Sequence, residues 1–381
     1  MKKHADVAVV GLGTMGSMAA WQLSKSGLSV LGFEQFGIGH DRSAYGGGSR
    51  RFRIASPFVD ETPFTYASYA KFRELEQETG QHLLSYSGAL TIGHPDSEHM
   101  QNVITSAEQF NIDYEVFEGN DATYHYPQHH LLPGEIIIRE KTGGVLRPEQ
   151  IIISAVERAK SLGAQIHSYT PVQKVESHAN GITITTEKDT YEVKKIVITT
   201  GAWADKLIPS LSEHFRAQRL ILSWFMPKNP EEFKEANFPN FTRLSDEIHI
   251  QGTPALDGRF VRVTNNSENI TEARFVVNDP DQFDKNIPLS YAKDIGEQIV
   301  RLIPNLYPDP VQILPFVDGY SKDGLPIVGS LKDDHNIVLV CGFSGQGFSQ
   351  APVMGEIATQ LVLNNQSTYD IKHLSPNRFK L

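Results

Sequence analysis

The chain has 381 residues, and its 35 Lys and Arg against 45 Asp and Glu give a formal net charge of −10. An acidic chain binds nucleic acid poorly, and no segment reaches the ~20 apolar residues of a membrane-spanning helix, so we expect neither a nucleic-acid nor a membrane partner. The length predicts two domains, and the single cysteine, Cys341, excludes an intrachain disulfide.

The first predicted strand covers residues 5–10 and follows directly on Met1-Lys2-Lys3-His4. This leaves no room for a signal peptide ahead of the strand. Together with the single cysteine, it predicts a cytoplasmic location.

That strand leads into Gly11-Leu12-Gly13-Thr14-Met15-Gly16, a helical pattern and a second strand over 28–33. This order predicts a dinucleotide-binding unit. Gly11 permits the tight turn, Gly13 lets a pyrophosphate approach the backbone, and Gly16 lets helix and strand pack closely. The helix N-terminus offers unpaired N–H groups to the phosphates.

Glu34 ends the second strand. Its carboxylate can accept hydrogen bonds from ribose hydroxyls. It would repel a 2′-phosphate, which argues against NADP.

Further elements follow in chain order. A glycine-rich loop over 40–53 precedes a predicted helix over 64–79, and another helix is expected over 148–162. Strands are predicted over 87–93, 135–139, 144–146, 164–169, 172–177, 181–186, 191–193 and 195–199, the last ending in Thr200-Gly201-Ala202-Trp203.

Residues 214–290 are predicted to form a β-rich middle with a loop over 227–240, followed by a helix over 290–302. A buried strand over 336–340 then meets a second glycine turn, 342–347, and a last helix covers 351–363. A strand, glycine turn and helix in this order predict a second backbone-lined site for an anion or carbonyl group.

These elements predict an α/β (α+β overall) fold with a Rossmann-like FAD-binding domain and a β-sheet-rich substrate domain. One N-terminal fingerprint, with the rest of the nucleotide domain scattered along the chain, favours FAD over NAD. We expect a discontinuous FAD-binding domain over 1–85, 141–213 and 310–381, and a substrate domain over 86–140 and 214–309.

The chain resembles flavoprotein amine oxidases of the D-amino-acid-oxidase superfamily, most of all the branch of monomeric sarcosine oxidase, N-methyltryptophan oxidase and fructosyl-amino-acid oxidases. The resemblance covers nearly the whole length. It rests on 7–34, Gly47-Gly48-Ser49-Arg50-Arg51-Phe52-Arg53, 200–203, Asp323-Gly324-Leu325-Pro326-Ile327-Val328-Gly329 and 342–348.

The resemblance implies roles for individual residues. Ser49 and Arg50 match positions beside the flavin ring, Arg53 matches the arginine that binds the substrate carboxylate, and Val172 matches a backbone contact to adenine. The expected catalytic residues are Arg50, Arg53, Arg262 and Gln346. The expected cofactor-binding residues are Gly11, Gly13, Thr14, Met15, Gly16, Glu34, Gln35, Ser43, Ser49, Arg50, Val172, Gly201, Trp203, Gly342, Gly345, Gln346, Gly347 and Phe348.

Several positions depart from the family pattern. Phe316 stands where covalent flavin enzymes carry a cysteine, so we expect non-covalent FAD. Arg262 stands at the position of a lysine that activates oxygen, Ser349 at that of a second carboxylate-binding lysine, and Gln346 at that of a histidine.

Other readings of these residues remain open. Arg50 and Arg53, placed on one side of a helical turn, form either a carboxylate clamp or a solvated patch, and we favour the clamp. Arg262 is either a cation over the flavin or an exposed strand residue. His249 and Gln251 either line the pocket or have a structural role, and we favour the structural role. A buried thiol is expected for Cys341. No third ligand accompanies His129-His130, so no metal is expected.

The resemblance implies FAD-dependent oxidation of a C–N bond in a small secondary or primary amine, an N-substituted amino acid. The imine product hydrolyses to an aldehyde and an amine, and dioxygen becomes hydrogen peroxide. We expect a monomer or weak homo-oligomer. The alternatives are a dehydrogenase that uses an electron carrier and a non-catalytic dinucleotide-binding protein.

Overall fold

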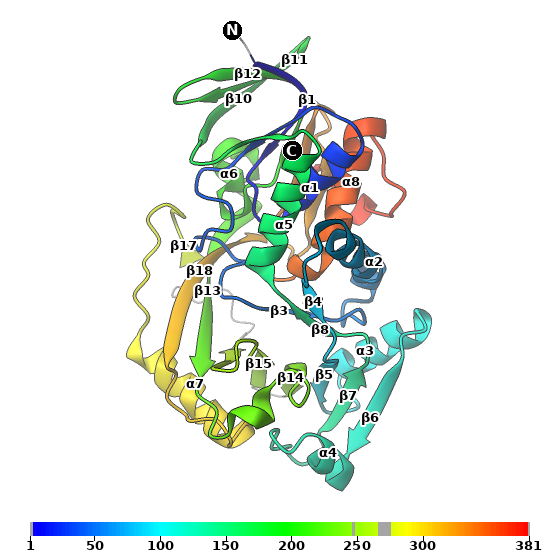
Figure 1. The fold of residues 1–381 in the computed structure, drawn as a ribbon, viewed down its shortest axis with the longest axis vertical. Coiled ribbons are helices and arrows are strands. Elements are labelled where there is room, and N and C mark those ends of the chain that lie inside the picture. Colours follow the sequence, from blue (N-terminus) through cyan, green and yellow to red (C-terminus); the bar gives the residue numbers. More distant parts are fainter. Residues whose placement is uncertain (1–2, 246–247, 266–275, 380–381) are drawn as a thin grey trace.

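The first predicted strand lies inside an eight-stranded sheet that forms the upper half of the molecule (Figure 1). The computed structural model describes residues 3–245, 248–265 and 276–379. β1 runs parallel to β12 and β2, and β12 runs parallel to β20. The strands of this sheet are β10 (Val172–His178), β11 (Gly181–Thr186), β12 (Thr190–Ile198), β1 (Lys3–Val10), β2 (Val30–Phe33), β9 (Gln165–His167), β19 (Ile327–Ser330) and β20 (Ile337–Cys341).

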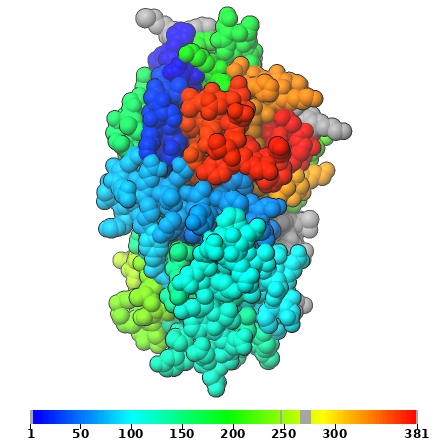
Figure 2. All heavy atoms as spheres, turned by 90° about the vertical axis from the view of Figure 1, so that its right-hand side faces the viewer, coloured from blue at the N-terminus to red at the C-terminus, as the bar shows by residue number. Residues whose placement is uncertain are grey.

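Helices cover this sheet and pack against one another. They are α1 (Thr14–Lys25), α2 (Thr62–Thr79), α5 (Pro148–Ser161), the short α6 (Ala204–Leu207) and α8 (Ala351–Asn364). α1 packs against α8 and α5. The α1–α8 contact is close because Gly355 has no side chain: a Cβ there would lie 2.6 Å from the backbone of Met18. Figure 2 shows the C-terminal segment beside the N-terminal one in the same half of the molecule.

A nine-stranded sheet forms the other half (Figure 1). Its strands, mostly antiparallel, are β17 (Val276–Val277), β13 (Phe215–Phe225), β16 (Val261–Asn265), β15 (Ile248–Thr253), β14 (Asn240–Ser245), β5 (Ala89–Gly93), β7 (Ile136–Glu140), β6 (Tyr114–Glu118) and β18 (Gln312–Ser321). Its helices are α3 (Glu98–Gln109), α4 (Gly119–His125) and α7 (Leu289–Leu302). A small third sheet joins β3 (Arg50–Phe52), β8 (Gly144–Leu146) and β4 (Leu84–Ser85).

Short 3-10 helices complete the described fold. They are η1 (Val59–Glu61), η2 (Gly201–Trp203), η3 (Pro209–Leu211), η4 (Pro230–Phe233), η6 (Phe348–Gln350), η7 (Lys372–Leu374) and η8 (Pro376–Phe379).

The nine-stranded sheet has two chemically different faces. Side chains alternate along a strand, and Phe241, Ile250 and Val261 point to a buried apolar cluster that includes Ile295 and Ile299 of α7. Thr242, His249, Gln251 and Arg262 alternate with them and point the other way, where they line one cavity together with Leu244.

The predicted fold class is confirmed, and most predicted elements are present. Residues 98–125, which had no prediction, contain α3, β6 and α4. The division into two domains stays a proposal. β18 belongs to the nine-stranded sheet. We therefore propose that the last segment of the FAD-binding domain begins after β18 and not at residue 310. In the described part of the chain, no helix has both the length and the apolar character needed to cross a membrane.

Candidate active site

One cavity of about 850 Å³ runs from the first glycine turn to the polar face of the nine-stranded sheet. Most residues predicted to bind the cofactor line it: Gly11, Gly13, Thr14, Met15, Glu34, Gln35, Ser43, Arg50, Val172, Gly201, Trp203, Gly342, Gly345, Gln346, Gly347 and Phe348. Gly16 and Ser49 do not. Arg53 and Arg262, predicted to be catalytic, line the cavity as well.

The three glycines of the first turn differ in what surrounds them. Gly11 has φ +87°, and a Cβ there would lie 2.8 Å from the Thr199 carbonyl oxygen. A Cβ at Gly16 would lie 1.8 Å from the Gly11 oxygen, so this glycine permits close packing, as predicted. A Cβ at Gly13 would meet only side chains at ordinary contact distance, the nearest being Tyr45 at 3.4 Å.

Glu34 is buried at the end of β2. Its Oε2 accepts a hydrogen bond from the Leu12 N–H at 2.8 Å, and its Oε1 accepts one from the Phe36 N–H at 2.9 Å. Burial raises the pKa of this carboxyl, and the two backbone donors oppose that rise. Glu34 therefore holds the glycine turn as well as lining the cavity.

Two buried polar groups near this turn, the Tyr45 hydroxyl and Thr200 Oγ1, have no hydrogen-bond partner within residues 3–245, 248–265 and 276–379. Both residues line the cavity. A buried hydroxyl without a partner is unfavourable, so a ligand rich in oxygen fits here. A dinucleotide on Gly13 and Glu34 meets this requirement.

The glycine-rich loop wraps around one arginine. The Gly47 and Gly48 N–H groups donate to Glu149 Oε1 at 2.9 and 3.0 Å. Arg50 donates to the Ser49 oxygen at 2.6 Å and to the Gly46 oxygen at 2.7 Å. The loop thus fixes the Arg50 guanidinium at the cavity wall.

The helical turn predicted for Arg50 to Arg53 is wrong. Arg50–Phe52 form β3, which pairs with β8, so neighbouring side chains point to opposite sides. Arg50 turns to the glycine loop, and Arg51 donates to Thr242 Oγ1 on β14. Arg53 follows the end of the strand, and all three arginines reach the cavity.

The exposed alternative for Arg262 is also wrong, since this residue is only 3% exposed. Alternation along β16 turns it to the cavity side of the sheet, where Nη1 donates to the Ser49 oxygen at 2.8 Å. Burial, and then Arg50 and Arg51, lower its pKa. Ser49 does not line the cavity but accepts bonds from two arginines that do, and its Oγ lies 2.8 Å from Thr253 Oγ1.

Arg53 has a free donor. Its Nη1 is buried and has no hydrogen-bond partner among the described residues. Burial lowers the pKa of Arg53, and Glu140 and Glu61 oppose this fall. Burial raises the pKa of Glu61 to about 7, and Gln350, Ser56 and Arg53 oppose the rise. In the amide orientation that satisfies both groups, Gln346 Nε2 donates to Glu61 Oε2 at 2.8 Å.

Polar residues on the sheet face and on α3 complete this end of the cavity. His249 and Gln251, expected to be structural, line the cavity, because alternation in 248–253 puts polar residues on that face. His99 of α3 and Thr242 join them. Burial lowers the pKa of His99 to about 3 and of His249 to about 4, so both imidazoles are neutral at pH 7. No sequence signal pointed to His99 or Glu61.

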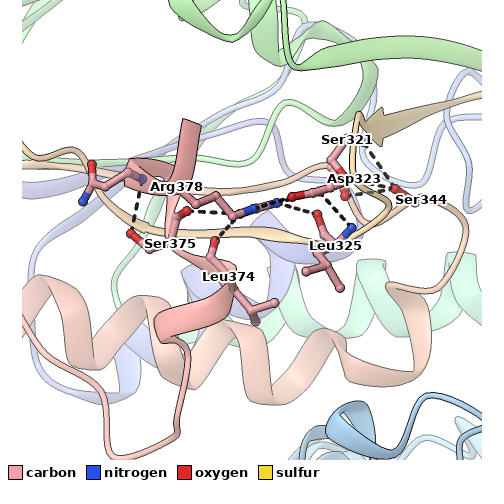
Figure 3. A network of polar contacts seen from close by, with 9 residues as sticks. Ser321, Asp323, Leu325, Ser344, Leu374, Ser375 and Arg378 are labelled. Carbon is pink, nitrogen blue, oxygen red and sulfur yellow. Dashed lines mark hydrogen bonds and ion pairs between the residues drawn. The ribbon is translucent and has the colours of Figure 1, made fainter. Parts of the chain in front are cut away.

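The second glycine turn is held from two sides. Asp318 of β18 accepts a hydrogen bond from the Gly345 N–H at 3.1 Å, and burial raises its pKa to about 6. The Ser321 N–H donates to Ser344 Oγ at 3.3 Å. Arg378 binds the Asp323 carboxylate and nearby carbonyl oxygens from the C-terminal segment (Figure 3).

Phe316 and Cys341 are both buried. A Cβ at Gly46 would lie 2.2 Å from the Phe316 ring, so this ring packs under the glycine loop. Burial raises the pKa of the Cys341 thiol to about 12, which keeps it protonated. His129 stacks on Phe238 with ring centroids 5.0 Å apart, and the described residues contain no group of three or more potential ligands for a metal.

The family model described as FAD dependent oxidoreductase matches residues 6–361. The chain is 30% identical to the monomeric sarcosine oxidase of Streptomyces avermitilis, over 99% of this chain and 98% of that protein. It is 27% identical to the N-methyl-L-tryptophan oxidase of Yersinia pestis, over 98% and 99%.

Solved structures share the fold. NikD, an amino acid oxidase of nikkomycin biosynthesis, superposes with a TM-score of 0.85 at 18% identity, covering 98% of both chains. Glycine oxidase from Geobacillus kaustophilus has a TM-score of 0.80 at 19% identity, again covering 98% of both chains.

Proposed function

Because this chain belongs to the family of FAD dependent oxidoreductases, we propose that it oxidises the C–N bond of a small N-substituted amino acid. One observation carries this proposal: Arg53 presents a buried donor that no described residue pairs with, in the same cavity as the glycine turn. A carboxylate-bearing amine held there would lie beside a flavin bound to that turn.

The protein contributes binding and charge. Gly13 and Glu34 would hold the pyrophosphate and ribose of FAD, and Arg50 and Arg262 would lie near its ring. When bound, FAD accepts a hydride from the carbon next to nitrogen and passes the two electrons to an acceptor. The amine also loses a proton, and the imine takes up water and splits into a carbonyl compound and an amine.

The cavity walls support this chemistry without a dedicated protein base. His99 and His249 are neutral, so they add no charge to that already present on the arginines. Several arginines line the site, Arg50, Arg51, Arg53 and Arg262 among them, and they would stabilise electron density that moves onto the cofactor. Binding of the substrate carboxylate would hold the amine in position for the reaction.

A screen of flavin reduction tests the function. The purified protein is mixed without oxygen with N-methyl amino acids, N-glycated amino acids, glycine and cyclic imino acids, and the flavin absorbance is followed. We expect bleaching by N-methyl amino acids first. If no amine of any class bleaches the flavin, the proposed function is wrong.

A dehydrogenase is the second candidate. Arg262, rather than lysine, stands at the position that the resemblance associates with oxygen activation, and its Nη1 is engaged by the Ser49 oxygen. Admitting air to the reduced protein separates the two. Rapid return of the flavin colour with one hydrogen peroxide per amine supports an oxidase, and slow return with fast bleaching of an artificial electron acceptor supports a dehydrogenase.

We expect the flavin to be bound without a covalent link. Phe316 is an aromatic residue with no thiol to offer, and Cys341 is buried and protonated. Precipitation with acid should release all yellow colour into the supernatant. Colour that stays with the washed precipitate would contradict this expectation.

Carboxylate binding should weaken above pH 7. The Glu61 carboxyl, with a pKa of about 7, is neutral below that pH and leaves Arg53 free. Above it, the ionised group competes for Arg53 and repels the ligand. Because one proton is linked to binding, the dissociation constant of butyrate, followed by flavin absorbance, should rise up to about tenfold per pH unit above 7.

Glu61→Gln is the matched variant for this titration. It keeps the shape of the side chain and removes the charge, so the dissociation constant should change less than about twofold between pH 6 and 8. If the dissociation constant of the wild-type protein does not rise above pH 7, or if that of Glu61→Gln still does, Glu61 does not control carboxylate binding.

We also propose that the protein works in the cytoplasm as a monomer or weak homo-oligomer. The single cysteine, buried in β20, is compatible with a reducing compartment. Gel filtration of the flavin-loaded protein measures the oligomeric state.

A further inference from the structure

Arg51 is a half-buried cation on the cavity wall. It lines the cavity and donates to Thr242 Oγ1. Within the described ranges it forms no ion pair with a carboxylate. Burial, and then the charge of Arg53, lower its pKa well below the usual value.

Carboxylates offset part of the effect of burial on Arg50 and Arg53. Burial lowers the pKa of both arginines; Glu149 and Asp318 oppose this fall for Arg50, and Glu140 and Glu61 oppose it for Arg53. A guanidinium stays charged in a protein, and a buried charge without a partner is strongly unfavourable. Arg51 is therefore available to bind an anion that a ligand brings into the cavity.

The FAD phosphates are poorly placed to be that anion. They are assigned to the Gly11–Gly16 turn on the eight-stranded sheet, whereas Arg51 reaches Thr242 on the nine-stranded sheet. The flavin ring is uncharged when oxidised. The remaining source of negative charge is the substrate.

Uncharged polar groups surround the same position. His99 Nε2, His249 Nδ1 and Gln251 Oε1 are buried and have no hydrogen-bond partner in the part of the chain that the structure describes. All three residues line the same cavity as Arg51 and Arg53. Neutral imidazole N–H groups and a guanidinium are suitable donors to a carboxylate.

We propose that the substrate carries two acidic groups, one bound by Arg53 and a second bound by Arg51 together with Thr242. This inference rests on the proposed amine oxidation and narrows its substrate to acidic N-substituted amino acids. The second acid belongs either to the side chain or to the substituent on nitrogen.

Pairs of substrates that differ only in charge test this directly. N-methyl-L-aspartate is compared with N-methyl-L-asparagine, N-methyl-L-glutamate with N-methyl-L-glutamine, and iminodiacetate with sarcosine. In at least one pair, kcat/KM should favour the diacid by about a hundredfold. If no pair shows more than a threefold preference, the proposal is wrong.

Variants assign the preference to Arg51. Arg51→Leu should reduce the diacid preference from about a hundredfold to below threefold, and Arg51→Lys should keep about tenfold, because an ammonium lacks the planar two-bond geometry. Arg259→Leu, an exposed residue on the turn before β16, should keep the full preference. A full preference in Arg51→Leu would overturn the assignment.

A binding measurement keeps the test valid if Arg51→Leu does not fold or no amine reacts. Glutarate and valerate are titrated into wild-type holoenzyme and followed by flavin absorbance. Glutarate should bind about a hundredfold more tightly, and binding within threefold of valerate would overturn the proposal. Failure of the function itself looks different, since then no amine bleaches the flavin whatever its charge.

Discussion

Gly13→Val is expected to give a folded chain that purifies without flavin. Gly13 has a negative φ of −76°, and a Cβ there meets Tyr45 at 3.4 Å without a clash. The added methyl groups would instead occupy the cavity beside Tyr45 and Ser43, where the pyrophosphate must approach the backbone. The ratio of flavin to protein absorbance should fall at least tenfold.

Two other glycine variants distinguish loss of flavin binding from loss of the fold. Gly13→Ala should weaken flavin binding less, because only Cβ is added. Gly16→Ala should lose folded protein rather than flavin alone, since its Cβ would lie 1.8 Å from the Gly11 oxygen. Circular dichroism and melting temperature separate the two outcomes. A Gly13→Val protein with stoichiometric flavin would show that the dinucleotide lies elsewhere.

Arg53→Ala is expected to raise KM for the best amine by about a hundredfold and to leave the flavin spectrum nearly unchanged. Loss of one member of a buried charge pair commonly costs a few kcal/mol in binding, and Ser349 offers no second cation here. Steady-state kinetics and the absorbance spectrum measure both parts of the prediction.

Arg53→Lys should recover only part of the affinity, because an ammonium cannot form the two parallel bonds of a guanidinium. Arg259→Ala removes an exposed arginine outside the cavity and serves as the control. Normal turnover in Arg53→Ala would mean that the substrate has no carboxylate, or that another group binds it.

The cofactor half of the site could be predicted from the sequence because its signals are local. A strand, Gly11, Gly13, Gly16, a helix and Glu34 lie within 30 residues. The role predicted for each glycine depends only on its neighbours in this short unit and on the ligand. The structure adds only a second role for Glu34, which accepts the Leu12 and Phe36 N–H groups. The same locality explains why most strands and helices were predicted correctly.

The substrate half was decided by tertiary structure. The spacing of Arg50 and Arg53 fits a helical turn, but pairing with β8 makes this segment a strand and sends Arg51 to Thr242. Arg262 was ambiguous between exposed and buried until the sheet placed it against the Ser49 oxygen. His99 and Glu61 carry no local signal at all.

The physical reason is that burial and charge compensation depend on residues far apart in the chain. Arg51 and Thr242 are separated by 191 positions, and Ser49 and Arg262 by 213. The sequence by itself predicted a bound dinucleotide, in agreement with the family, and proposed the Gly11–Gly16 turn for it. Only the fold decided which cations share one cavity, and our proposal about the charge of the substrate depends on that arrangement.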